Sequence, residues 1–412
     1  MAYRSLENLF HMDASSDRKA NAEARAKARF EAESTFHTGI QTPVGELFLA
    51  VPRELSVLNE RVLRRERLVS QSMRSLPTVA QWAMIRGLVI DEVVSTNDLE
   101  GVFSTRRQIN ELFQEESHPG GLAVQKRFRE LAKLYIGLTD PTTRIPEKPE
   151  DVRSIYDVLM TGEPLGKGKK PDGMLFRRDG VDIIGAGGRV IHTGLQPESQ
   201  INEAIECMLA LCRSDDVPET YSAILGHFIF EYAHPFYDGN GRTGRYLLAL
   251  YLSRPLSTLT SLSLSRVIAE NRSAYYRSFR EAEHPLNHGE LTLFVMNMLE
   301  TIGIAQEELE EGIAVKKGLL NDLEGSLSAF ATAHGLSEKE TDAVYMLAQL
   351  DLFGSFPEAT WDEVARHLGL GRQQTRDYMS RLEGKGLVVR PSKRPLKFSL
   401  SESAVAELGL RG

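Results

Sequence analysis

The sequence predicts a mainly helical protein that has one β-hairpin near its middle and a small helix-turn-helix module at its end. Three features of the 412 residues support this prediction. Long segments repeat apolar residues every three or four positions, which is the spacing of one buried helix face. Two short β-branched runs flank a glycine-rich turn at 185–188, a pattern typical of a hairpin. From residue 336 onward, three helical segments are followed by two strand-like ones.

The N-terminal third of the chain is predicted to be helical. Residues 17–34 are rich in alanine with interleaved charges, which favours a solvated helix or a mobile arm. Residues 55–112 predict two or three amphipathic helices, and another helical run covers 122–138. The expected buried face in this region comprises Leu76, Val79, Trp82, Ile85, Leu88 and Val89.

The middle of the chain is expected to hold the hairpin and the helices that follow it. The strands of the hairpin are 181–184 and 189–192, and it is the one hairpin that we predict before the C-terminal module. Helices are predicted over 200–213, 223–233, 242–252, 291–309 and 312–330.

The C-terminal residues change in character near Leu336. Helices are predicted over 336–350, 361–368 and 373–383, with a turn at 369–371 and strands over 386–390 and 396–400. Three helices followed by a hairpin are typical of a winged helix-turn-helix domain. The predicted parts of the chain are an N-terminal arm (1–40), a helical region (41–140), a central core (141–300), a helical linker (301–334) and the winged helix-turn-helix domain (335–412).

The composition is that of an ordinary folded protein. Apolar residues make up 42% of the chain and charged residues 26%, and a net charge of −8 offers nucleic acid no general attraction. No run of apolar residues is long enough to predict a membrane helix. The first residues include Glu7 and Asp13 and no apolar segment, so we expect no signal peptide and a cytoplasmic protein.

The most informative segment is HPFYDGNGRTGR, which runs from His234 to Arg245. Its Gly-Asn-Gly run, residues 239–241, lies between two helical stretches, and these residue types tolerate left-handed backbone. Successive backbone N–H groups can then face an anion at the positive end of the next helix. Arg242 and Arg245 are three positions apart on that helix, so both can reach the same anion. The pattern predicts a polyphosphate site.

Two residues at the start of this segment can carry chemistry. Asp238 supplies a carboxylate, and Mg²⁺ usually takes one or two carboxylates while phosphate oxygens and water complete its shell. Capping of the following helix is the alternative role, and both can hold together. His234 lies four residues earlier, and an imidazole suits a general base for a substrate hydroxyl, although helix-end histidines are often structural. Phe236 is expected to anchor the loop in the core.

The segment resembles the signature of the Fic family, H-x-F-x-[DE]-G-N-G-R-x-x-R, at every specified position. The resemblance implies a Fic-type helical core with the hairpin as its flap. It also implies an enzyme that moves AMP from ATP onto a Ser, Thr or Tyr hydroxyl of a target protein or of itself. The implied roles are general base for His234, Mg²⁺ ligand for Asp238, anion hole for Gly239, Asn240 and Gly241, and polyphosphate binding for Arg242 and Arg245.

Two further segments resemble the family outside this loop. The hairpin lies where the family has a flap that pairs with the target chain by strand addition, and a simple cover over the core is the alternative. Residues 269–276 resemble the helix that follows the motif, in which Tyr276 would help to wall the adenine. Glu283 stands where many relatives carry Asn.

A shorter motif, Thr96 to Gly101, matches the inhibitory pattern of the family, [ST]-x-x-x-E-[GN]. The resemblance implies that Glu100 pairs with Arg245 and occupies the guanidinium that the γ-phosphate needs. Glu100 could instead orient a water molecule for the removal of AMP.

The C-terminal module carries a local charge of +6 between Arg372 and Lys397, in a chain that is acidic overall. This excess suggests contact with double-stranded DNA. The candidate base-reading residues open the predicted recognition helix, and the candidate phosphate contacts lie on the wing. They are Gln373, Gln374 and Arg376 on the helix, and Arg390, Lys393 and Arg394 on the wing. The alternative is a protein-contact or homodimerisation module.

The leading interpretation is a protein adenylyltransferase that uses ATP and Mg²⁺. One alternative is the same loop with another nucleotide donor or group, or with AMP removal as its reaction. Another is a DNA-binding transcription regulator whose core only senses nucleotide. The presence of His234 argues against a mere sensor, because sensing needs no base.

Overall fold

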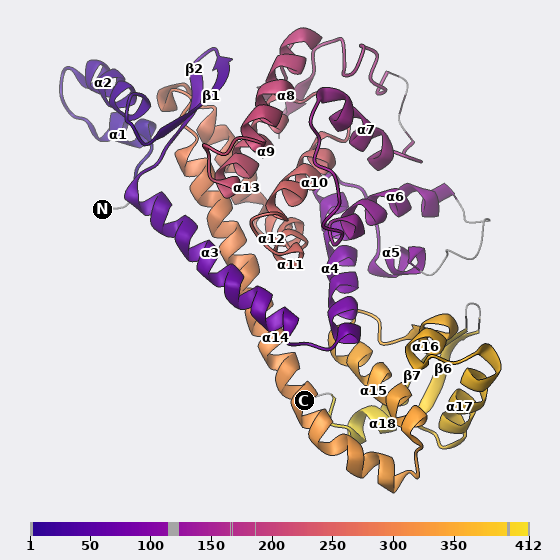
Figure 1. Ribbon diagram of the computed structural model, residues 1–412. Coiled ribbons are helices and arrows are strands. Elements are labelled where there is room, and N and C mark those ends of the chain that lie inside the picture. The colour runs from indigo at the N-terminus through magenta and orange to yellow at the C-terminus, as the bar shows by residue number, and fades with distance from the viewer. Residues whose placement is uncertain are drawn as a thin grey trace. The chain divides into compact units, whose positions relative to one another are not determined.

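The computed structural model describes residues 3–113, 123–164, 166, 168–185, 187–393 and 396–410. These residues are mainly helical, as the sequence predicts, with three small antiparallel sheets (Figure 1). The chain forms two compact units: the first comprises Met1–Arg67, Glu92–Ser104 and Leu122–Gln306, and the second Leu68–Asp91, Thr105–Gly121 and Glu307–Gly412. The five predicted parts, which are continuous ranges, stay predictions. None of the described helices is long and apolar enough to cross a membrane.

The bounds of the elements follow the chain. The first unit contains α1 (Leu6–Met12), α2 (Arg18–Phe30), β1 (Thr35–Thr42), β2 (Gly45–Ala50), α6 (Ala123–Gly137), α7 (Pro149–Leu159), β3 (Asp182–Ile184), β4 (Val190–Thr193), α8 (Glu198–Cys212), α9 (Glu219–Ala233), α10 (Asn240–Leu252), α11 (Thr258–Ser261), α12 (Leu264–Glu270), α13 (Arg272–Ala282) and the 3₁₀ turn η1 (Pro285–Asn287). The second unit contains α5 (Arg106–Leu112), α15 (Glu338–Phe353), β5 (Ala359–Thr360), α16 (Trp361–Leu368), α17 (Arg372–Gly384), β6 (Val388–Lys393), β7 (Leu396–Leu400) and α18 (Glu402–Glu407). Both units include residues of α3 (Arg53–Arg74), α4 (Thr78–Leu99) and α14 (Thr292–Ala333).

The core of the first unit forms around α9. Residues 220–230 of this helix are all buried, so α9 is enclosed on every side, as expected of a helix that is apolar nearly all round. Helices α8 and α10 pack against it along their lengths (Figure 1). Helix α10 is buried over residues 242–252 as well. The loop between α9 and α10 is therefore held at both ends by core helices.

Two hairpins occur in the first unit, and the sequence predicted only one of them. The predicted hairpin is confirmed as β3 and β4, in which Ile183 faces His192. The hairpin of β1 and β2, in which Thr35 faces Ala50, corrects the expectation of a single hairpin before the C-terminal module. The Pro-Val-Gly turn at 43–45 was a signal for it in the sequence, and the structure buries Thr38 and Ile40 between exposed neighbours of β1.

The C-terminal part of the second unit has the predicted order of elements. Helices α15, α16 and α17 are followed by β6 and β7, and the short β5 adds a third strand next to β7. Reciprocal capping by Thr360 and Glu363 begins α16, and Gly369 ends it with a φ of 64°. The winged-helix role of this module stays a prediction.

Two expectations about long helices were wrong. The predicted helices 291–309 and 312–330 are a single helix, α14. Gly312 costs a helix about 1 kcal/mol relative to Ala, and burial of the flanking Leu309 and Ile313 offsets this cost. On α4, Trp82 is 54% exposed instead of buried. The buried side of this part of α4 carries Ala80, Ala83, Gly87 and Ile90, and a Cβ at Gly87 would lie 2.9 Å from Ser355 Oγ.

Candidate active site

The loop between α9 and α10 is shaped by two left-handed residues. His234 ends α9 with φ 49° and ψ 60°, and Gly239 precedes α10 with φ 82°. A left-handed conformation is uncommon for a residue with a side chain, so surrounding contacts must hold His234 in place. At Gly239 a Cβ would lie 2.6 Å from Met160 Sδ, which leaves room for glycine only.

The side chain of Asn240 closes the loop. Its Oδ1 accepts a hydrogen bond from the backbone N–H of Phe236 at 2.9 Å, and its Nδ2 donates to the Phe236 carbonyl at 2.7 Å. Phe236 is fully buried and stacks on Tyr156 with ring centroids 3.6 Å apart, so its predicted anchoring role is confirmed. Because the side-chain amide of Asn240 makes these two hydrogen bonds, an anion at this residue would be contacted by its backbone N–H.

Arg177 is a residue of the site that the sequence analysis missed. Its guanidinium is fully buried and donates to four carbonyl oxygens. These are His234 O (2.8 Å), Asp179 O (2.7 Å), Leu195 O (2.7 Å) and Ala233 O (3.3 Å). Arg177 thus fixes the backbone on both sides of His234. An isolated arginine outside any periodic pattern gives no signal in the sequence.

The imidazole of His234 is prepared to act as a base. Its Nδ1 is buried and has no hydrogen-bond partner among the described residues. Burial, and after it the charge on His192, lowers the pKa of His234 to about 4. The ring is therefore neutral at pH 7 and has a free lone pair for a proton.

The second motif arginine meets the predicted inhibitory segment. Arg245 is buried, and its Nε donates to Thr96 Oγ1 at 2.8 Å while Nη2 donates to Glu100 Oε1 at 2.8 Å. The same Oε1 would lie 2.1 Å from a Cβ at Gly241, so the Glu100 carboxylate fills the space over the Gly-Asn-Gly turn. Gly101, with φ 68°, follows the end of α4. The structure thus brings together the residues that the two motifs supply.

A further acid, Glu231, approaches Arg245 from α9. Burial raises the pKa of Glu231 to about 8, even though Arg245 acts in the opposite direction. At neutral pH this carboxyl is consequently protonated, and Arg245 forms its ion pair with Glu100.

The remaining charges of the loop are also countered. Arg242 is buried and forms an ion pair with Glu163, and Asp238 Oδ2 lies 2.9 Å from Lys169 Nζ. Glu163 lies 79 residues before Arg242 and Lys169 lies 69 residues before Asp238, and no pattern in the sequence points to them. Asp238, Arg242 and Arg245 therefore each have a counter-charge from another segment of the chain.

The residues present fit a magnesium ion that is bound together with phosphates. No group of three or more His, Cys, Asp or Glu in the described part of the chain could hold a metal by itself. Asp238 offers one carboxylate with a side chain that is 37% exposed. One protein carboxylate, with substrate oxygens for the rest of the shell, is the usual arrangement for Mg²⁺.

Tyr276 contacts the end of α4 in this structure. Its hydroxyl donates to the Leu99 carbonyl at 3.4 Å, and Arg272 on the same helix donates to the carbonyl and the carboxylate of Asp98, at 2.7 and 3.0 Å. These contacts place the end of α4 against α13. The role of Tyr276 at the adenine stays a prediction.

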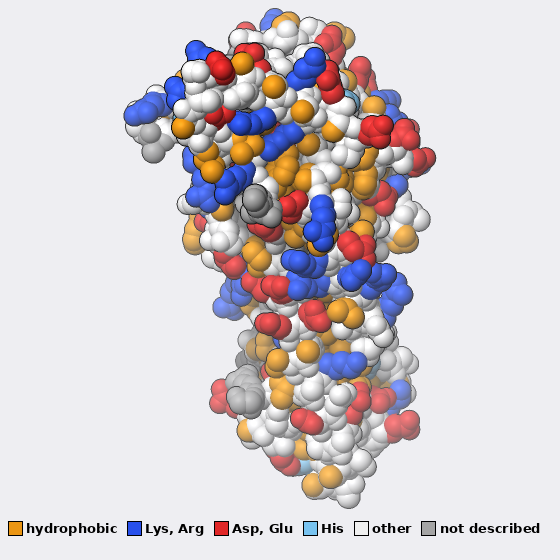
Figure 2. Space-filling view, turned by 90° about the vertical axis from the view of Figure 1, so that its left-hand side faces the viewer, with side chains coloured by type: hydrophobic (Ala, Val, Ile, Leu, Met, Phe, Trp, Pro, Cys, Tyr) orange, Lys and Arg blue, Asp and Glu red, His pale blue; other side chains and the backbone are white. Residues whose placement is uncertain are grey.

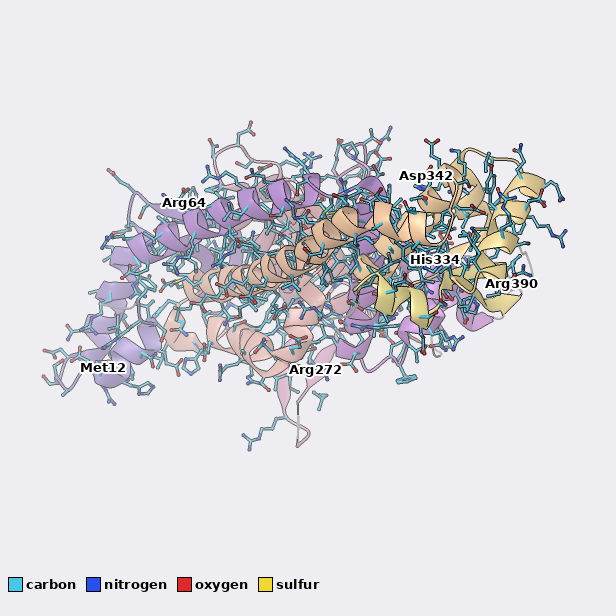
Figure 3. The ribbon with its side chains drawn as sticks, turned by 90° about the horizontal axis from the view of Figure 1, so that it is seen from below. Met12, Arg64, Arg272, His334, Asp342 and Arg390 are labelled. Atoms are coloured by element: carbon cyan, nitrogen blue, oxygen red, sulfur yellow. The ribbon has the colours of Figure 1, made fainter. Side chains whose placement is uncertain are left out.

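The candidate DNA-contact residues divide into two groups. Gln373, Gln374 and Arg376 are exposed on the first turns of α17. Arg390, labelled in Figure 3, forms an ion pair with Glu383 at 2.5 Å. The side chain of Lys393 and all of Arg394 lie outside the described residues. DNA binding by this surface stays a prediction.

The loop and its surroundings are similar to known proteins. A model of the Fic/DOC family matches residues 146–252. Over 198 residues the chain is 28% identical to a probable protein adenylyltransferase of Aquifex aeolicus. That match covers 48% of this chain and 55% of the relative, so the chain spans about half the length of the curated relative.

Solved structures of Fic proteins are also similar to the chain. A Fic family protein from Desulfovibrio desulfuricans is 18% identical, with a TM-score of 0.49, over 83% of this chain and 96% of its own. A Fic-1 fragment from C. elegans is 16% identical, with a TM-score of 0.46, over 76% of this chain and 81% of its own.

Proposed function

Because a model of the Fic/DOC family matches residues 146–252, we propose that the chain is a Fic-type enzyme that transfers AMP from ATP to a Ser, Thr or Tyr hydroxyl of a target protein or of itself. One observation carries the proposal. A buried, neutral His234 stands at the start of a loop that presents two buried guanidinium groups and one carboxylate. A nucleotide sensor would have no use for such a base.

The residues of the loop divide the reaction between them. His234 accepts the proton of the acceptor hydroxyl, whose oxygen bonds to the α-phosphorus as pyrophosphate leaves. The backbone at Gly239–Gly241 and the side chains of Arg242 and Arg245 bind the polyphosphate and hold it in line. Asp238 would hold Mg²⁺, which supplies positive charge for the leaving pyrophosphate. This step requires three ion pairs to break, namely Arg242 with Glu163, Asp238 with Lys169 and Arg245 with Glu100.

We further propose that Glu100 inhibits the enzyme in its resting state. Its carboxylate pairs with Arg245 and fills the space over Gly241, where a phosphate would otherwise lie. A hydrogen bond between charged groups contributes about 1.5–3 kcal/mol. Removal of the carboxylate should consequently raise the rate of AMP transfer by about ten- to a hundredfold.

The test is the incorporation of label from [α-³²P]ATP and Mg²⁺ into protein. We expect a Glu100→Gly chain to incorporate at least about tenfold more label than the wild type, and a Glu100→Gly/His234→Ala chain to incorporate none above background. Glu100→Gln, which keeps the size of the side chain, separates the loss of charge from the loss of the side chain and the greater backbone freedom of glycine. A folded Glu100→Gly chain that incorporates no label from ATP or from the other labelled nucleoside triphosphates would overturn the proposal.

A further inference from the structure

The β3–β4 hairpin is attached to the end of α9, beside His234. The His192 ring, through Nε2, donates to the carbonyl of Tyr232 at 2.9 Å, and the backbone N–H of Leu195 donates to the carbonyl of Ala233 at 3.2 Å. Between these contacts, Gly194 lies directly against the base, since a Cβ at this position would be 2.9 Å from His234 Cβ. Strand β4 and the residues after it therefore follow the last turn of α9 to the base.

His192 is the side chain by which β4 is anchored. Val190, Ile191 and Thr193 are exposed, whereas the side chain of His192 is only 9% exposed. Its Nδ1 lies 2.7 Å from Oε2 of Glu283, the residue that follows α13. Glu283 stands where the family resemblance led us to expect an asparagine, and here its carboxylate is used to bind the hairpin.

The partners of His192 define its protonation. One ring nitrogen faces a carbonyl and the other a carboxylate, and both of these are acceptors, so both nitrogens can donate at once only when the ring is protonated. Burial opposes this charge, but the hydrogen bond and charge of Glu283 outweigh it and raise the pKa of His192 above 6.5. The titratable groups around the ring are Glu283 from α13, and Glu231, Tyr232 and His234 from α9 and its end.

We propose that His192 and Glu283 are positioning residues that hold the hairpin against His234 while His192 is protonated, and that they thereby align an acceptor chain paired with the hairpin. The alignment rests on the proposed function. The attachment of the hairpin does not, because it follows from the contacts alone. The name His192–Glu283 latch is used below for this pair.

The latch has a defined dependence on pH. Because the pKa of His192 is raised in the folded protein, the contribution of the pair is complete below pH 6.5 and is lost as the pH rises through the higher, folded value. The charge of His192 also helps to lower the pKa of His234. Loss of the latch should therefore release the hairpin and raise the pKa of the base together.

The attachment is tested by amide hydrogen exchange of peptides that cover β3 and β4, corrected for intrinsic rates, and by NMR titration of the histidines. In His192→Gln and Glu283→Gln we expect exchange at least about tenfold faster than in the wild type at pH 6. Wild-type exchange should approach that of the variants as the pH rises, and the pKa of His234 should rise in His192→Gln. Glu281→Gln is the matched control, because Glu281 is a half-exposed acid on α13 whose ion pair, among the described residues, is with Arg277 at 3.7 Å. If the hairpin amides of Glu283→Gln exchanged at the same rate as those of the wild type, the proposal would be overturned.

The alignment is tested in the Glu100→Gly background with [α-³²P]ATP and Mg²⁺. Adding Glu283→Gln should lower self-incorporation of AMP by about tenfold, while the Kd for Mg²⁺–ATP from calorimetry stays within about twofold. Unchanged incorporation in a variant with a released hairpin would overturn the alignment. If Glu100→Gly itself incorporates no AMP, the proposed function fails, and the alignment of the acceptor chain fails with it. The hydrogen-exchange experiment still decides whether His192 and Glu283 attach the hairpin.

Discussion

Individual buried residues give the loop between α9 and α10 its chemistry. The proposed base, His234, has an unusual backbone conformation, and Arg177 supplies hydrogen bonds that hold it in place. The residues of the motif could be predicted because their pattern is contiguous in the sequence. Arg177, Glu163 and Lys169 could not, because each reaches the loop from a distant segment and belongs to no periodic or spaced pattern.

Replacement of Arg177 should destabilise the fold. Arg177→Ala would leave the carbonyl oxygens of His234, Asp179 and Leu195 without their donor, whereas that of Ala233 keeps the backbone N–H of Leu195. Each unsatisfied buried group costs about 1–3 kcal/mol, and relaxation recovers part of the sum, so we expect the free energy of unfolding to fall by about 3–5 kcal/mol. Urea denaturation followed by circular dichroism measures this. Arg178→Ala, at the exposed neighbouring position, should change it by less than about 0.5 kcal/mol. Similar losses in both variants would contradict the role given to Arg177.

At the scale of elements, the contact between α4 and α13 determines how firmly Glu100 is held. The end of α4 is bound through Asp98 and Leu99 to Arg272 and Tyr276 of α13. The existence of both helices followed from apolar spacing, but their contact did not, because spacing says nothing about partners. The wrong prediction for Trp82 has a related cause. Helix α4 is apolar nearly all round, so more than one face fits a helical period.

Loss of the Arg272 contact should weaken the proposed inhibition in part. The Arg272–Asp98 pair is 44% and 72% exposed, and such pairs contribute about 0.2–1 kcal/mol. Arg272→Ala should therefore raise AMP incorporation by up to about fivefold, well below the effect of Glu100→Gly. The comparison variant is Arg277→Ala, which removes an exposed arginine of the same helix that pairs within α13. Equal rates in Arg272→Ala and the wild type would show that the end of α4 is held by other contacts.

At the scale of the whole molecule, basic side chains are mostly mixed with acidic ones and are not gathered in one place. The net charge is −8, and basic and acidic side chains are interspersed over the face shown in Figure 2. In the C-terminal module, Arg381 pairs with Glu340, Arg390 with Glu383 and Lys397 with Glu358. Part of the local excess of +6 counted in the sequence is therefore neutralised by acidic residues of the module itself. Composition could predict the excess but not these pairs, which depend on the folded positions of acids from other elements.

Any DNA binding by this acidic chain should depend on the exposed turn of α17 and on salt. With a mixed-sequence 30-base-pair duplex in 50 mM salt, fluorescence anisotropy should report binding that weakens steeply up to 200 mM salt. Arg376→Ala should weaken it by about three- to tenfold, while Arg372→Ala serves as a nearby exposed control whose guanidinium lies 3.7 Å from Asp362. Absence of binding at 50 mM salt would favour the protein-contact role instead.

The Glu100 carboxylate belongs to the same polypeptide as the arginine that it contacts. A tethered group acts at an effective concentration of about millimolar or more, whatever the concentration of the protein. The proposed inhibition should consequently persist when the enzyme is diluted, because a nucleotide would compete with a group that cannot diffuse away. The activity per molecule would then rise when α4 moves or when a partner moves it, and would not depend on the concentration of the protein.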